Sequence, residues 1–107
     1  MITLFRAVSQ QEKEDYDAHP AFRTARNTLE GKQFFKTRIA VTSFVASAEE
    51  QNYDPAYAHL MIVTVDDDRF DVVQRTRKLD NYDAVHIEED DLSAFNNCVT
   101  FVKQEVL

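Results

Sequence analysis

Apolar residues recur along the chain with two different spacings, which separate expected strands from expected helices. Alternating or continuous apolar runs predict strands at residues 1–8, 32–36, 59–65, 84–88 and 98–106. The run 59–65 is apolar at most positions, which is typical of a central strand covered on both faces. The run 98–106 alternates, so we expect it to close the sheet at an edge.

Two helices are expected from a capping pattern and from an apolar stripe. Ser9 followed by Glu12 forms a capping box, and the helix it opens should end near Ala18, before the His19–Pro20 pair. The second helix carries apolar residues at three- and four-residue spacing. These residues are Ala40, Val41, Phe44, Val45 and Ala48.

Shorter elements fill the remaining stretches. We expect a loop at residues 22–27, a turn and short helix at 66–73 and a loop at 78–83. Asp90 or Asp91 is expected to cap a single helical turn that runs through Phe95. The resulting order, β-α-β-α-β-(α)-β-β, predicts one α+β domain over residues 1–107, with two main helices and a mixed, strongly twisted sheet.

The stretch 27–37 contains the chain's only glycine, Gly31. Glycine allows a sharp turn and a close approach of other backbone, so we expect it to lead directly into the strand 32–36. Phe34 and Phe35 then point to opposite faces of that strand. One ring enters the core, and the other lines the far side, which is the candidate cleft.

Charge and cysteine content exclude several classes of function. The formal net charge of −7 and the pI of about 4.8 argue against binding to nucleic acid. Cys98 is the only cysteine, and the acidic run 66–68 lacks the glycine and later glutamate of a calcium loop, so no metal site is expected. No membrane span or signal peptide is apparent, so a cytoplasmic protein is expected, or an effector delivered elsewhere without a signal peptide.

Candidate site residues each have a structural alternative. Arg6 can clamp an anion or form an ordinary ion pair. Lys32, Phe34 and Thr37 can form one wall of a ligand pocket, with the ring as a stacking platform, whereas core packing is the commoner role of such rings. The run 88–91 follows a strand, so its carboxylates can serve a site or simply cap a helix.

Several motifs together resemble small bacterial domains related to ADP-ribosyltransferases, which occur at the C-termini of polymorphic toxins and as stand-alone proteins. The resemblance covers nearly the whole chain in order, and its most specific part is the stretch Asn-Thr-Leu-Glu-Gly-Lys-Gln-Phe at 27–34. Leu-Phe-Arg-Ala-Val-Ser at 4–9, Ala84 to Leu92 and the pair Phe95–Asn96 carry the remainder.

This resemblance implies an ADP-ribosyltransferase-like fold with NAD as the substrate. Arg6 would hold the phosphate or ribose of NAD, and Phe34 or Phe35, with Thr37 nearby, would shape the nicotinamide pocket. Glu88 or Glu89 would hold the ribose and support transfer. The two glutamates are adjacent, and adjacent strand residues face opposite ways, so only one of them is expected to enter the cleft.

Two hypotheses follow for the function. In the first, the chain is a NAD-dependent ADP-ribosyl transferase or NAD glycohydrolase that acts on a protein target or on NAD alone. In the second, it is an inactive, acidic interaction module that retains the fold and binds a partner or acts as an inhibitor.

Overall fold

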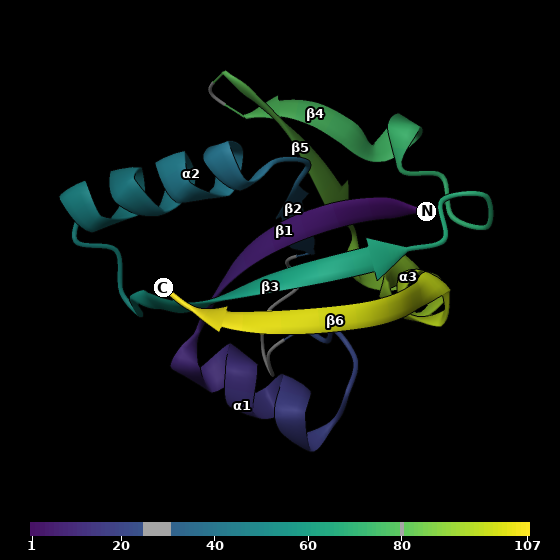
Figure 1. Cartoon of the computed structure of the whole chain (residues 1–107), viewed down its shortest axis with the longest axis horizontal. Coiled ribbons are helices and arrows are strands. Elements are labelled where there is room, and N and C mark those ends of the chain that lie inside the picture. The colour runs from purple at the N-terminus through teal and green to yellow at the C-terminus, as the bar shows by residue number, and fades with distance from the viewer. Residues whose placement is uncertain (25–30, 80) are drawn as a thin grey trace.

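The computed structural model describes residues 1–24, 31–79 and 81–107. These residues form a six-stranded sheet in the order β4-β5-β2-β1-β3-β6, with helices on both sides (Figure 1). The expected α+β class is confirmed.

The first strand and helix match the pattern of their residues. β1 spans Ile2–Ser9, and α1 spans Gln10–Ala18. The Ser9 hydroxyl accepts a hydrogen bond from the Glu12 backbone N–H over 3.2 Å, which confirms the serine half of the expected capping box. The glutamate half was wrong, because the Glu12 carboxylate accepts from Arg6 and Lys32.

The second strand and helix also lie where they were expected. β2 spans Lys32–Phe35, and α2 spans Arg38–Glu50. Thr37 lies two residues beyond the end of the strand and caps the helix, since its hydroxyl accepts from the Ala40 N–H over 3.1 Å.

β3 (Tyr57–Val65) lies between β1 and β6 (Val99–Val106), and β6 forms one edge of the sheet. The edge position predicted for β6 is therefore confirmed, and β3 is an interior strand with a core on each face, although it lies next to the edge and not at the centre of the sheet. In Figure 1 the three strands run side by side, with α2 and α1 on opposite sides of them.

The expectation of a mixed sheet was wrong, because all neighbouring strands of the described residues pair antiparallel. β2 and β3 both run antiparallel to β1, so they are parallel to each other. They are joined through α2 but are not neighbours, because β1 lies between them. The crossover typical of parallel strands is present without a parallel pair.

The loop expected at 78–83 was also wrong, because β4 (Thr76–Leu79) and β5 (Tyr82–Ile87) form a hairpin there. Polar residues dominate β4, which is an edge strand and needs only one apolar face. Its pairing with β5 includes an exposed ion pair, Lys78 Nζ to Asp83 Oδ1 at 3.0 Å.

Three short elements complete the described chain: the 3₁₀ turns η1 (Val73–Arg75) and η2 (Glu89–Asp91), and the helix α3 (Leu92–Cys98). The short helix expected at 66–73 is replaced by a turn followed by η1. Asp91 makes no capping hydrogen bond, contrary to expectation. Its carboxylate instead accepts from Arg75 Nη2 over 3.3 Å.

Two hydrophobic cores lie on opposite faces of the sheet. The larger core gathers around Phe34 and Phe95, and the smaller one lies between the sheet and α2 around Phe35 and Val41. Phe34 and Phe35 thus face opposite sides as expected, but both are buried in a core. Among the described residues, no helix is long and apolar enough to cross a membrane.

Candidate functional site

A pocket of about 690 Å³ opens where β2 begins and β5 ends. Its size falls within the usual range for small-molecule sites. It is lined by Arg6, Gly31, Gln33, Phe44, Tyr53, Tyr57, His86, Glu88, Glu89 and Asp90. The pocket therefore combines one guanidinium, an aromatic wall and an acidic rim.

Arg6 reaches the pocket because β1 and β2 diverge. The two strands are in register only at Phe5 and Phe35, whereas β1 and β3 are in register at eight positions. Arg6 Nη1 donates to the Gln33 carbonyl oxygen over 2.8 Å, so the guanidinium joins the strands where the backbone ladder has stopped. Its Cζ lies 5.7 Å from the centre of the Phe34 ring, in cation–π contact.

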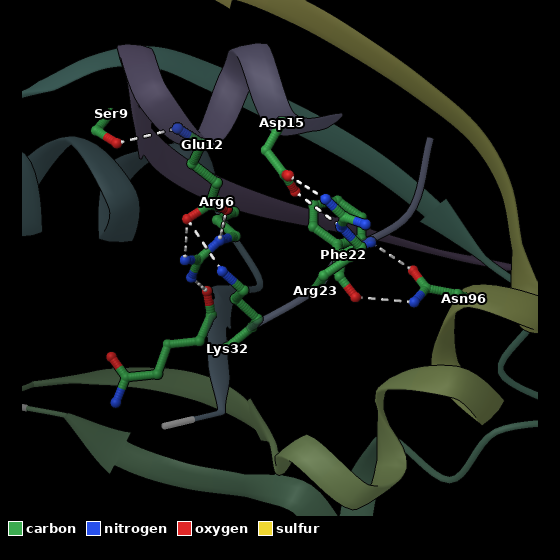
Figure 2. A network of polar contacts seen from close by, with 9 residues as sticks. Arg6, Ser9, Glu12, Asp15, Phe22, Arg23, Lys32 and Asn96 are labelled. Atoms are coloured by element: carbon green, nitrogen blue, oxygen red, sulfur yellow. Dashed lines mark hydrogen bonds and ion pairs between the residues drawn. The ribbon is translucent and has the colours of Figure 1, made fainter. Parts of the chain in front are cut away.

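Glu12 holds the other side of this guanidinium (Figure 2). Arg6 Nε and Nη2 donate to the two Glu12 carboxylate oxygens, each over 2.7 Å. Lys32 Nζ donates to one of the same oxygens over 3.3 Å. One carboxylate thus serves two cations, and this Arg6–Glu12–Lys32 cluster carries a net charge of about +1 when all three groups are ionised.

Burial and charge act in opposite directions within the cluster. Burial raises the pKa of the Glu12 carboxyl, but the hydrogen bonds and charges of Arg6 and Lys32 outweigh it, so this pKa lies below its usual value. Burial and the Arg6 charge lower the pKa of Lys32, which is only 9% exposed. The cluster therefore keeps Glu12 ionised while it disfavours the charge on Lys32.

Glu88 and Glu89 both line the pocket. The expectation that only one could enter rested on a strand through Glu88, but β5 ends at Ile87. Glu88 is the extended residue before η2, and Glu89 begins that turn. Successive side chains at a strand-to-turn junction do not alternate between two faces, so neighbouring carboxylates can face one hollow.

Three of the lining residues, Phe44, Tyr53 and Tyr57, are aromatic and form one wall of the pocket. Tyr53 and Tyr57 stack with their centroids 5.4 Å apart and their planes at 10°, and Phe44 packs against Tyr57 at 5.4 Å. Burial, and to a smaller extent the neighbouring Tyr53, raises the pKa of Tyr57 to about 12, so the Tyr57 hydroxyl stays protonated at neutral pH. Tyr53 is 55% exposed and presents its ring to solvent.

Gly31 is required at the pocket by a close backbone approach. A Cβ at this position would overlap the Ile87 carbonyl oxygen and approach the Glu88 Cα. The φ angle of Gly31 is not positive, so this position requires glycine for its missing side chain and not for a left-handed backbone. Gly31 thereby lets the start of β2 lie against the residues that carry the acidic rim.

The predicted site residues separate into two groups. Arg6, Glu88 and Glu89 come together around the pocket, whereas Lys32, Phe34 and Thr37 do not line it. Phe34 is fully buried in the larger core, Lys32 points to Glu12, and Thr37 caps α2. Residues 27–30 of the predicted stretch 27–34, and residues 25–27 of the expected loop 22–27, lie outside the described residues.

Sequence reasoning missed the other lining residues. Gln33 and His86 are cross-strand partners on the face opposite Phe34, so the alternation of β2 could have placed Gln33 on the cleft side. Tyr53 lies after the end of α2, and Tyr57 begins β3. Two tyrosines in and beside a polar connection were the signal from which an aromatic wall could have been predicted.

No group of three or more metal-ligating side chains occurs within residues 1–24, 31–79 and 81–107. Comparison with protein-family models, with curated proteins and with solved structures found no match to the chain. A functional assignment therefore rests on the chemistry of the pocket.

Proposed function

We propose that the chain has an ADP-ribosyltransferase-like fold and that its pocket binds NAD. The proposed reaction breaks the bond between ribose and nicotinamide, with transfer of ADP-ribose to a target protein or to water. The observation that carries the proposal is the meeting of Arg6 with Glu88 and Glu89 at one pocket. These are the residues that the resemblance implies for the phosphate and for the ribose.

The acidic rim suits the charge that develops during this reaction. As the glycosidic bond breaks, its electron pair leaves with nicotinamide, and positive charge builds on the ribose. A carboxylate of Glu88 or Glu89 held against the ribose stabilises that charge and lowers the barrier. A water oxygen or a nucleophile of the target protein then bonds to the ribose carbon and releases a proton.

Arg6 retains donors for a ligand phosphate. A guanidinium has five N–H groups, and the hydrogen bonds to Glu12 and Gln33 use three of them. Within the described residues, the other two make no hydrogen bond. Because Arg6 lines the pocket and is fixed by its partners, its free N–H groups are oriented in advance for an anion.

The stacked tyrosines take the role that the resemblance assigned to Phe34. Phe34 is too deeply buried to touch a ligand, whereas Tyr53 and Tyr57 present an aromatic wall to the pocket. A flat nitrogen heterocycle such as nicotinamide or adenine stacks on a ring of this kind.

The test of catalysis is nicotinamide release from NAD by the purified chain, with chromatographic detection. Glu88→Gln and Glu89→Gln are made singly and together, and the double variant is expected to release nicotinamide about 100-fold more slowly. Glu50→Gln, an exposed acid at the end of α2 that does not line the pocket, is the matched control. Equal rates in the wild type and the double variant would remove the catalytic assignment.

The test of the aromatic wall is the affinity for NAD. Tyr53→Leu is expected to weaken NAD binding about tenfold, since stacking of one base contributes about 1–3 kcal/mol. Tyr53→Phe keeps the ring and should bind as the wild type does. Isothermal titration calorimetry measures the three affinities.

The second candidate is an interaction module that retains the fold without catalysis. It is favoured by the two-point pairing of Arg6 with Glu12, which is the arrangement of a structural ion pair. This candidate predicts that no nicotinamide is released, even with candidate target proteins present. NAD that raises the thermal unfolding midpoint without turnover would identify an inactive nucleotide-binding module, and no shift would exclude NAD as its ligand.

A further inference from the structure

The two edges of the sheet differ in how well they are protected from pairing. β4 is a short edge, Thr76–Leu79, with the exposed basic residues Arg77 and Lys78. β6 is an eight-residue edge without proline, and its register with β3 is continuous from Phe101 to Val106. Natural proteins blunt exposed edges by shortness, charge, proline or bulges. β4 uses shortness and charge. β6 is longer and carries Lys103 and Glu105, and its side chains contact both main helices: Gln104 donates to Asp17 of α1 over 2.9 Å, and Glu105 accepts from Arg38 of α2 over 2.8 Å. These are side-chain contacts, and they leave the outer backbone groups of β6 without a strand partner among the described residues.

The register of β6 identifies the backbone groups that face outward. The Leu107 N–H donates to the carbonyl oxygen of Ala58 in β3 over 3.0 Å, so Leu107 points its polar backbone atoms inward. Backbone direction alternates along a strand, so Phe101, Lys103 and Glu105 also point inward. Val102, Gln104 and Val106 therefore turn their N–H and C=O groups to the free edge, with no backbone partner among the described residues.

The same segment carries exposed apolar side chains. Val106 is 81% exposed, Phe101 is 63% exposed and Leu107 is 46% exposed. Lys103 and Glu105 lie two residues apart on the same face of the strand as Phe101, whereas Val106 lies on the other face. Within one chain Glu105 pairs with Arg38 at 2.8 Å and with Lys103 at 3.6 Å, and the side chains of all three residues are at least partly exposed.

We propose that β6 pairs antiparallel with β6 of a second copy of this chain, in a register centred on Gln104. In this register Lys103 lies opposite Glu105 of the second copy, twice by symmetry. Val102 lies opposite Val106, and Phe101 lies opposite Leu107. The outward backbone groups of Val102, Gln104 and Val106 all find partners in the ladder.

Charge selects this register over its neighbours. A pairing centred on Lys103 places the two lysines opposite each other, and one centred on Glu105 does the same with the two glutamates; like charges directly opposite are destabilising. The Gln104 centre is the register that sets opposite charges face to face. The contact is self-complementary, as a two-fold interface requires, and it joins two sheets into one. It does not depend on the function proposed for the pocket.

The experiment exchanges the charges at positions 103 and 105 and measures the molar mass in solution by sedimentation equilibrium. The chain concentration is varied from low to high micromolar at ~0.15 M salt, where the Debye length is about 8 Å. The wild type is expected to approach twice the mass of one chain at the highest concentration. Lys103→Glu and Glu105→Lys each set like charges opposite each other in the dimer, so each alone should remain at the mass of one chain. An equimolar mixture of the two variants restores every opposite pair and should recover the double mass.

Controls separate this contact from general charge effects. Arg77→Glu makes the same charge change as Lys103→Glu on the other edge of the sheet and should associate as the wild type does. Far-UV circular dichroism and thermal unfolding establish that each variant is folded. A wild type that keeps the mass of one chain throughout would overturn the proposal, and so would single variants that associate normally or a mixture that fails to recover.

Discussion

At the scale of single residues, Glu12 organises the charged groups beneath the pocket. Its carboxylate accepts from Arg6 twice and from Lys32 once, and all three side chains are largely shielded from water. Removing one partner of a buried ion pair leaves the other charge uncompensated, which costs more than the pair itself contributes. Here the loss would leave two neighbouring cations without their shared anion.

Glu12→Gln keeps the shape of the side chain and removes its charge. We expect the free energy of unfolding at neutral pH to fall by about 3 kcal/mol, because Arg6 and Lys32 lose the carboxylate between them. Urea unfolding followed by circular dichroism measures the difference. Glu14→Gln, an exposed acid on the same helix, is the control and should change stability little. Equal stability of the Glu12 variant and the wild type would show that the cluster is not structural.

The pKa of Glu12 determines the sign of the pH dependence. The folded state lowers this pKa below its ordinary value of 4.5, so the unfolded chain binds the proton more readily. The carboxylate therefore contributes its full stability above that value, and the contribution is lost as the pH falls through the folded pKa. Stability measured across this acidic range should fall less steeply in Glu12→Gln than in the wild type.

At the scale of elements, the Asn96 side chain of α3 holds the backbone of Phe22, which lies in the segment after α1. Asn96 Nδ2 donates to the Phe22 carbonyl oxygen over 2.9 Å, and Asn96 Oδ1 accepts from the Phe22 N–H over 2.8 Å (Figure 2). Both backbone groups of Phe22 are thereby satisfied. Its ring can then enter the larger core, where it contacts Phe34 edge to face at 5.1 Å.

Asn96→Ala should loosen this attachment. Phe22 would keep its ring in the core with two unsatisfied backbone groups, so we expect stability to fall by about 1–3 kcal/mol. Amide hydrogen exchange at Phe22 should accelerate more than exchange in β1. Asn97→Ala, the exposed neighbour on the same helix, is the control. Unchanged exchange at Phe22 would mean that ring packing alone holds the segment.

Local patterns predicted most elements but not the β4–β5 hairpin or the acidic turn. Thr76–Leu79 has little apolar character, and its strand conformation comes from the ladder that β5 offers. Asp91 looked like a helix cap because of its position before Leu92. Its carboxylate instead pairs with Arg75, which lies 16 residues away in the chain. Neither the pairing of β4 with β5 nor the pairing of Asp91 with Arg75 could be predicted from neighbouring residues in the sequence.

At the scale of the whole molecule, one sheet separates two cores. Phe34 lies in the larger core and Val41 in the smaller one, and both are fully buried. β1 and β3 contribute residues to both cores. Neither core can therefore unfold without disturbing the strands on which the other core depends. We therefore expect the described chain to unfold in one cooperative step.

Substitutions on the two faces test this cooperativity. Phe34→Ala should lower the free energy of unfolding by about 3–5 kcal/mol, and Val41→Ala by about 2 kcal/mol, through lost burial and residual cavities. In each variant, unfolding followed by circular dichroism and by tyrosine fluorescence should give coincident transitions. Separated transitions in either variant would show that the two cores are independent units.

The sequence by itself determined the two main helices, most strands, the interior place of β3 and the edge place of β6, because caps and apolar periodicity act over a few residues. Only the tertiary structure decided the antiparallel pairing, the burial of Phe34 and the meeting of Arg6 with Glu88, Glu89 and the stacked tyrosines. These features depend on which strands become neighbours and on where β1 and β2 diverge. Such choices are made by contacts between residues far apart in the chain, which no local pattern encodes.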